Sequence, residues 1–310
     1  LAPPTNGRLA QQLVCACENL ADHLTHFYLF FMPDLARPEY RGRPWFPACE
    51  ARFRALTGSA AADVLQARAE FMHLMGLMAG KWPHTLSLQP GGTAKPLEAA
   101  EILRLITLLH GFRRFLERNT FGDDLEAVAG LDSVAALADW RQGRQGDLAL
   151  FLGAAEDLDL GGMGRATDRF LSYGAQGLAD AGVWDGGVRP LDPGLIVEDL
   201  SHAWLAGDAL PPSRGRTEPR ADKVGAYTWC KAPRYSGLVL ETGALARQMV
   251  AGHPLIRDLV AARGGSVEAR VLARLLELAL VVPQMEAWAR ALVVGEPWCH
   301  QGELPEAGER

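Results

Sequence analysis

The chain has 310 residues, of which 31 are Lys or Arg and 37 are Asp or Glu, so its formal net charge is −6 with the histidines neutral. Hydrophobic residues make up 48% of the chain, which excludes extensive disorder because there is ample apolar surface to bury. The acidic balance argues against non-specific nucleic-acid binding, which needs a basic surface. This length predicts one large domain or two packed lobes.

Apolar runs and cysteine spacing exclude further classes of protein. The most apolar stretch, 272–283, contains Arg274 and Glu277, so no segment approaches the roughly 18 uninterrupted apolar residues of a membrane span. The five cysteines are an odd number without CxxC spacing, which does not indicate a disulfide framework. We therefore expect a reducing, cytoplasmic compartment and see no secretory signal. Residues 1–5 resemble the middle of a loop, and we expect the chain to be an internal fragment.

The first predicted element is a long helix. Apolar residues recur every three or four positions from residue 8 to residue 32, which is the spacing of one helix face. Thr5 and Asn6 can cap the start of this helix, and Pro33 should end it.

Three more segments show the same helical period. The spacing predicts a second helix over 60–79 and a third over 96–118. A fourth helix is predicted over 267–292, in which Pro283 should cause a kink or a break.

The middle of the chain has a different composition. Residues 161–239 are rich in Gly, Pro and Asp, and the short apolar runs 169–174 and 195–200 predict short strands. The predicted fold class is mainly α. Long helices in 1–160 and 240–294 should form a bundle, and 161–239 should be a loop-and-strand insertion within a single domain.

The first predicted helix carries Asp22, His23 and His26 beside its apolar face. Asp22 and His26 are four residues apart and His23 and His26 are three apart, so each pair shares a side of the helix. A carboxylate and two imidazoles at the edge of a core can relay protons. Spacing alone favours the plainer interpretation, a solvated helix face with an ion pair.

Two further segments combine rigid and charged residues. The loop 80–84 combines Gly80 and Pro83 with Lys81 and His84, which suits close approach to a cofactor or partner. Lys231 and Arg234 flank a rigid Pro and could clamp an anion, although a surface turn has the same composition. The chain contains no Walker, GxSxG or HExxH motif.

Taken together, the chain resembles the large subunit of [NiFe]-hydrogenase in the order and spacing of its motifs. The matching segments are PPTN at 3–6, ENLADHLTHFY at 18–28, GKWPH at 80–84, GGT at 91–93, EDLSHAW at 198–204, YTWCKAPRY at 227–235 and ETGALAR at 241–247. Within that family, the segments 23–34 and 80–85 are most similar to the regulatory, hydrogen-sensing branch. Phe30 occupies a position that resembles the gas-channel lining, where catalytic members have a smaller side chain.

This resemblance implies a large-subunit fold and the reversible splitting of H2 into two protons and two electrons. It implies a Ni–Fe centre whose iron carries CO and cyanide, and Fe–S clusters in a separate small subunit. A hydrogen-sensing member would also have a sensor kinase as a partner. H2 is the implied substrate, and neither nucleic acid nor a membrane span is expected.

The resemblance also implies roles for individual residues. Asp22 matches the carboxylate next to the metal ligands, and His23 and His26 flank it. The loop with Lys81 and His84 matches a segment that faces the small subunit and its nearest cluster. The remaining matched motif residues, without an assigned role, are Glu198, Lys231 and Arg234.

The chain departs from the family pattern in its cysteines. Both motifs that supply the four metal-ligating thiolates, RxCGxC and DPCxxC, are missing. We therefore expect no metal site and no activity in this chain alone, although the full-length protein would be an oxidoreductase. The alternative interpretation is a non-catalytic, cysteine-less relative that acts as a hydrogenase maturation factor or scaffold.

Overall fold

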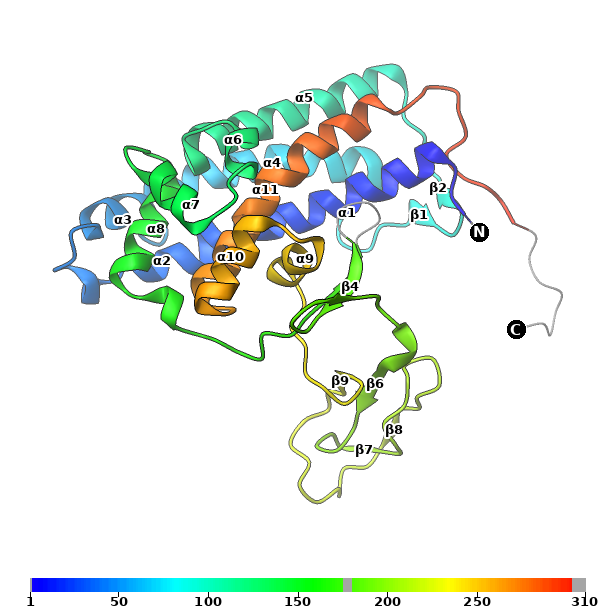
Figure 1. The fold of residues 1–310 in the computed structure, drawn as a ribbon. Helices are drawn as coiled ribbons and strands as arrows, with labels where there is room; N and C mark the ends of the chain where they lie inside the picture. The colour runs from blue at the N-terminus through cyan, green and yellow to red at the C-terminus, as the bar shows by residue number, and fades with distance from the viewer. Residues whose placement is uncertain (1, 175–179, 303–310) are drawn as a thin grey trace.

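The computed structural model describes residues 2–174 and 180–302. Among them, the four longest helices pack side by side as a bundle (Figure 1). These helices are α1 (Thr5–Thr25), α4 (Ser59–Ala79), α5 (Ala99–Phe115) and α11 (Val267–Arg290). The bundle forms the helical body of the molecule.

The core of the body lies around α11, which is apolar on most of its surface and contacts α1, α5, α6 and α9. A helix with apolar residues all round must be covered on all sides, and this explains its central place. On the neighbouring side of the bundle, α4 and α5 are joined by the rings of Phe71 and Phe112, which stack with centroids 3.9 Å apart.

Two of the long helices widen into π-helical turns. α1 continues through η1 (His26–Phe31) into α2 (Met32–Leu35), and α5 continues into η3 (Leu116–Phe121). The Tyr28 hydroxyl and the Thr120 hydroxyl join these turns, with 3.0 Å between their oxygens. The extra residue in each turn shifts the helical register, and π-turns of this kind are frequent at functional sites.

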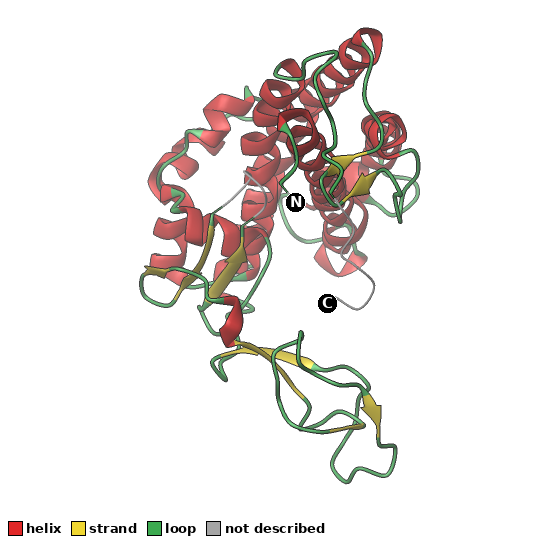
Figure 2. Ribbon diagram, turned by 90° about the vertical axis from the view of Figure 1, so that its right-hand side faces the viewer, coloured by secondary structure: helices red, strands yellow, loops and turns green. Residues whose placement is uncertain are grey.

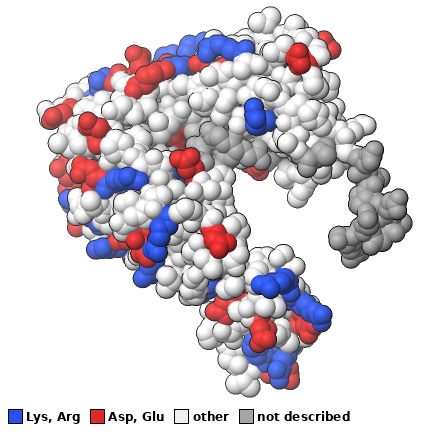
Figure 3. Space-filling view, turned by 45° about the vertical axis from the view of Figure 1, so that its right-hand side comes forward, with Lys and Arg blue, Asp and Glu red and all other residues white. Residues whose placement is uncertain are grey.

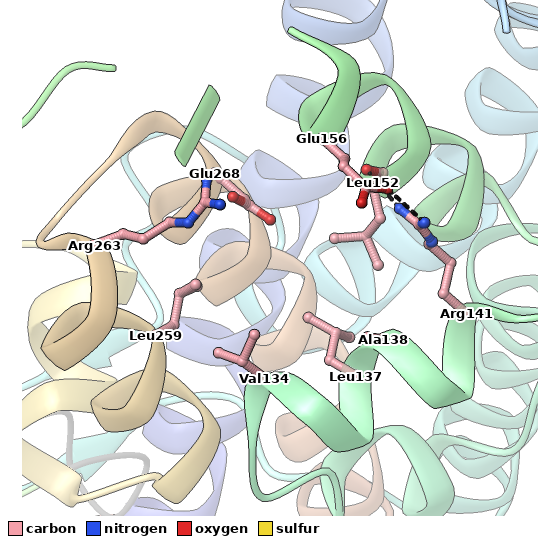
Figure 4. Close-up of a pocket in the computed structure, with 9 residues that line it drawn as sticks. All are labelled: Val134, Leu137, Ala138, Arg141, Leu152, Glu156, Leu259, Arg263 and Glu268. Atoms are coloured by element: carbon pink, nitrogen blue, oxygen red, sulfur yellow. Dashed lines mark hydrogen bonds and ion pairs between the residues drawn. The ribbon is translucent and has the colours of Figure 1, made fainter. Parts of the chain in front are cut away.

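Shorter helices pack around the long ones, and α3, α7 and α8 lie at the end of the bundle opposite the chain termini (Figure 1). The shorter helices are η2 (Pro38–Tyr40), α3 (Phe46–Phe53), α6 (Leu125–Ala129), α7 (Val134–Arg141), α8 (Asp147–Asp157), η4 (Leu160–Gly162), α9 (Ala244–Ala251) and α10 (Pro254–Arg263). Figure 4 shows a pocket between α7, α8 and α10, with Leu137 and Leu259 in its wall and an Arg141–Glu156 ion pair of 2.6 Å at one side.

The strands are short and antiparallel. They are β1 (Leu88–Gln89) paired with β2 (Gly92–Thr93), the three-stranded sheet of β3 (Phe170–Tyr173), β4 (Ala181–Trp184) and β5 (Val188–Arg189), β6 (Ile196–Asp199) paired with β9 (Ala232–Tyr235), and β7 (Leu205–Ala206) paired with β8 (Glu218–Pro219).

Residues 196–235 form a lobe that stands off the helical body (Figures 1 and 2). The lobe has its own small core of Leu200, Ala203 and Leu205. The three-stranded sheet and η5 (Pro193–Leu195) lie at the base of the lobe. Figure 3 shows an open notch between the lobe and the body.

Several helix boundaries differ from the predicted ones. The first helix begins at Thr5, and the Asn6 side chain does not cap it but donates to the Val293 carbonyl at 2.8 Å. Pro33 does not end the helical segment, because the π-turn before it places Pro33 in the first turn of α2, where a missing N–H is tolerated. α11 continues through Pro283 without a break, with buried residues on both sides.

Two other predicted helices are present with shifted boundaries. The second predicted helix differs from α4 by one residue, and the third, predicted over 96–118, corresponds to α5 with η3 and so begins and ends three residues later. The runs 169–174 and 195–200 contain β3 and β6. No helix in the described part of the chain is long and apolar enough to cross a membrane.

Candidate functional site

The end of α1 presents its polar side chains in different directions. Asp22 is exposed, whereas His23 is only 5% exposed. Successive helical residues lie about 100° apart around the axis, so neighbours face different sides. His26 begins η1, is half-buried and stacks on Phe31 with ring centroids 6.1 Å apart.

His23 enters a buried polar cluster that spans three helices. Its Nε2 lies 2.7 Å from the Glu277 Oε2 of α11. Arg247 of α9 donates through both Nε and a terminal nitrogen to the two Glu277 oxygens, at 2.8 and 2.6 Å. The Gln248 amide donates to Glu277 Oε1 at 3.0 Å. The structure thus connects the predicted histidine to a carboxylate 254 positions away in the sequence.

The cluster fixes the charge of its carboxyl group. Burial by itself would raise the pKa of Glu277, but the hydrogen bonds from His23 and Arg247 outweigh it and lower the pKa to about 2. Glu277 is therefore ionised at neutral pH and balances the charge of Arg247. The Nδ1 of His23 is buried and has no hydrogen-bond partner among the described residues.

His26 differs from His23 in its electrostatic surroundings. Burial and the nearby Arg274 guanidinium lower the pKa of His26, while Asp22 opposes this change. The imidazole is therefore neutral at pH 7. Its Nδ1 is also buried, and no described residue forms a hydrogen bond with it.

A cleft of about 470 Å³ lies along the exposed face of α1, between this helix, α4 and the loop that follows α4. Asp22 and Glu18 line it from α1, and Arg68 lines it from α4. Arg68 Nε donates to the Thr25 hydroxyl at 2.9 Å, and the Trp82 indole donates to Glu18 at 3.2 Å. The structure thus brings Asp22 and the predicted loop to one cleft.

The loop holds Lys81 and His84 at the surface. Both side chains are exposed, and Gly80 and His84 have φ values of 73° and 62° in the left-handed region. Gly80 tolerates this conformation because it has no Cβ. Thr85 ties the loop back to the helix by donating to the Ala79 carbonyl at 2.7 Å.

The other motif residues lie in the lobe, away from the histidine cluster. Lys231, directly before β9, places its Nζ 2.7 Å from Glu198 Oε2 of β6, the strand that pairs with β9. Arg234 donates to the neighbouring Pro233 carbonyl at 2.8 Å. The pair Glu198–Lys231 therefore stabilises the two-stranded ladder, and no contact joins it to Asp22 among the described residues.

Phe30 is 69% exposed, on the outer side of η1. A side chain that narrows a channel must be enclosed. Within this chain Phe30 is not enclosed, so a channel there requires cover from another chain or from a segment outside the described residues.

The described residues do not fit a Ni–Fe centre. No three His, Cys, Asp or Glu side chains in 2–174 and 180–302 are close enough together to hold a metal ion. Cys17 and Cys49 are buried, and burial raises the pKa of Cys49 to about 12. These groups are therefore thiols at neutral pH, whereas metal ligation requires thiolates.

Sequence reasoning missed two residues of the buried cluster, Glu277 and Gln248. The available signal was the acidic residue within the apolar stretch 272–283, because a buried carboxylate needs a partner. Arg247 belonged to the quoted ETGALAR motif but was not assigned a role.

Comparisons with known proteins place the chain in a family. The profile of the family described as nickel-dependent hydrogenase matches residues 59–298. The large subunit of the periplasmic [NiFeSe] hydrogenase of Desulfomicrobium baculatum is 23% identical, over 98% of this chain and 63% of that protein. The hydrogenase-2 large chain of Escherichia coli is 24% identical, over 61% of this chain and 34% of that one.

Solved structures of hydrogenases share the fold of this chain. The Ni-Fe-Se hydrogenase of D. vulgaris Hildenborough has a TM-score of 0.73 at 23% identity, covering 97% of this chain and 65% of that chain. That of Desulfomicrobium baculatum has a TM-score of 0.74 at 19% identity, covering 98% and 66%. The chain thus spans less than two thirds of the length of these relatives.

The predicted fold is therefore confirmed: it is mainly α and of the hydrogenase large-subunit type. The chain belongs to the nickel-dependent hydrogenase family.

Proposed function

We propose that this chain is part of the large subunit of a hydrogenase that interconverts H2 with two protons and two electrons. The observation that carries the proposal is the end of α1, where Asp22, His23 and His26 lie within five residues of one another in a member of this family. His23 is fixed by the Glu277–Arg247 pair, and Asp22 lines an open cleft.

These groups have complementary acid–base properties. Glu277 stays ionised and orients the His23 ring, so His23 acts as a positioned imidazole rather than a mobile one. The lowered pKa of His26 keeps that ring ready to accept a proton. Asp22, exposed to the cleft, can take a proton from a group bound there. We infer that this turn positions and carries protons.

The cysteine ligands of a Ni–Fe centre that carries CO and cyanide would come from segments outside the described residues. Electron transfer would use Fe–S clusters in a small subunit docked near the loop with Lys81 and His84. The exposure of both side chains supports a docking role for this loop. This chain alone would be inactive.

Replacing Asp22 with Asn should lower the H2-oxidation rate of the full-length complex by about 10²-fold or more, because the amide cannot accept the proton. Dye reduction under H2 and H2/D2 exchange measure the effect. Asp34→Asn is the matched control, because Asp34 lies on the next helix and pairs with exposed Arg37 at 2.7 Å. Equal rates for the two variants at equal nickel content would contradict the proposal.

We also propose that the hydrogenase is cytoplasmic and of the hydrogen-sensing type, with a sensor kinase as partner. The segments 23–34 and 80–85 and the residue Phe30 support this subtype by resemblance. In the assembled protein, a covered Phe30 would narrow gas access to the active site.

Replacing Phe30 with Leu in the complex should therefore speed inactivation by oxygen, because the smaller side chain widens the entrance. The inactivation rate under a fixed oxygen pressure is the measurement, and Leu86→Ala serves as control because Leu86 is 82% exposed in a separate loop. Unchanged inactivation in Phe30→Leu would remove the channel role.

A further inference from the structure

A cavity of about 330 Å³ lies where the lobe joins the helical body. One wall comes from the three-stranded sheet, through β4 and β5, and the other comes from η5 and the segment that follows β9. This volume suits a small organic molecule, and joints between structural units are common places for ligand sites. None of the residues proposed above for hydrogen chemistry lines this cavity.

One side of the cavity carries an excess of hydrogen-bond donors. Arg169 and Arg189 share one carboxylate, with Arg169 Nε 3.6 Å from Asp185 Oδ1 and an Arg189 terminal nitrogen 3.2 Å from Asp185 Oδ2. Each guanidinium has five N–H donors, so within the described part of the chain the single Asp185 carboxylate leaves most of them to water or to a ligand. Two guanidiniums in this arrangement suit the two oxygens of a carboxylate ligand.

The Tyr235 hydroxyl adds a further donor on the lobe side of the cavity. Its oxygen accepts the backbone N–H of Asp192 at 3.3 Å, which leaves its own proton free for a ligand. The Asp192 side chain is engaged in its own turn, where Oδ1 accepts the Gly194 N–H at 2.9 Å.

The rest of the wall is apolar and incompletely covered. Val183 forms the floor on the sheet side and is buried, while Leu195 and Leu238 remain 41% and 43% exposed. A ligand with an apolar body would cover both leucines and gain the free energy of their burial. The cavity thus combines one end that is rich in hydrogen-bond donors with an apolar wall.

We propose that this cavity binds a small organic carboxylate with an apolar body, such as an aromatic or branched-chain acid. The carboxylate lies against Arg169 and Arg189, and the apolar body lies against Leu195 and Leu238. Because the ligand contacts both the sheet and the base of the lobe, its binding fixes the lobe relative to the body.

Benzoate titrated into the full chain, with any partner that it retains, tests the proposal by calorimetry and by the rise in Tm. Benzyl alcohol has the same ring without the charge and should bind at least about 10-fold more weakly. Inorganic phosphate provides the charge without the ring and should also bind more weakly. If phosphate bound as tightly as benzoate, the proposed contact between an apolar ligand body and the two leucines would be wrong.

Arg169→Gln and Arg189→Gln should each weaken benzoate binding by about 10-fold. Arg189 is the safer variant for folding, because its side chain is 65% exposed. Arg214→Gln is the matched control, since Arg214 is an exposed lobe residue outside the cavity. The proposal is wrong if benzoate does not bind, or if all three variants bind it as the unchanged protein does. Failure of benzoate to bind, or equal binding by all three variants, would leave the proposed hydrogenase function untouched.

Discussion

Replacing Arg247 with Ala should lower the free energy of unfolding by about 3–5 kcal/mol at pH 7, because it leaves a buried carboxylate without its main partner. Arg247 makes two charge-assisted hydrogen bonds to Glu277, which is only 4% exposed. The His23 ring and the Gln248 amide cannot replace a permanent positive charge. Urea unfolding followed by circular dichroism measures the loss.

Two companion variants separate this effect from a general weakening of the fold. Arg165→Ala removes an exposed guanidinium that pairs with Asp168, and it should cost less than about 1 kcal/mol. The double variant Arg247→Ala with Glu277→Leu should recover much of the loss, since both charges are then gone. A cost for Arg247→Ala similar to that of Arg165→Ala would mean that the pair does not stabilise the bundle.

The pH dependence provides a second check on the same pair. The folded-state pKa of Glu277, about 2, lies below its ordinary value of 4.5, so the unfolded chain takes up the proton first as the pH falls. The stabilisation is therefore fully present above pH 4.5 and is lost as the pH falls towards 2. The difference between the unchanged protein and Arg247→Ala should shrink over that interval.

Local sequence signals were sufficient for much of the fold. The helices α1, α4, α5 and α11 each carry an apolar period long enough to identify them. Asp22, His23 and His26 were likewise identifiable, because they are close in the sequence and interrupt an apolar pattern. Their association with one helix end requires no knowledge of the rest of the chain.

The partner of His23 could not be predicted in the same way. Glu277 lies 254 residues away, and only the packing of α1 against α11 brings the two together. The register of η1 was also not predictable, since a strict 3.6-residue period does not include a π-turn.

The buried contacts of Tyr28 lead to the second large expected effect. The Tyr28 hydroxyl donates to Asp147 Oδ2 at 2.6 Å, and Arg52 donates to both Asp147 oxygens at 3.0 and 2.9 Å. Burial raises the pKa of Asp147, and the Arg52 and Tyr28 contacts oppose that increase. Arg52→Ala should therefore destabilise the chain by about 3–5 kcal/mol, because Asp147 would keep only the Tyr28 bond as its side-chain support.

The same substitution should also have a local effect. Tyr28 joins η1 to η3 through Thr120, so loss of Arg52 should speed amide hydrogen exchange in 26–31 and 116–121 before other helical segments. Arg52→Lys should recover only part of the stability, because an ammonium cannot make the forked contact. Arg43→Ala is the control, since the Arg43–Asp157 pair is exposed and should cost less than about 1 kcal/mol. Equal urea midpoints for Arg52→Ala and Arg43→Ala, or unchanged exchange in both π-turns, would show that the network does not hold the turns together.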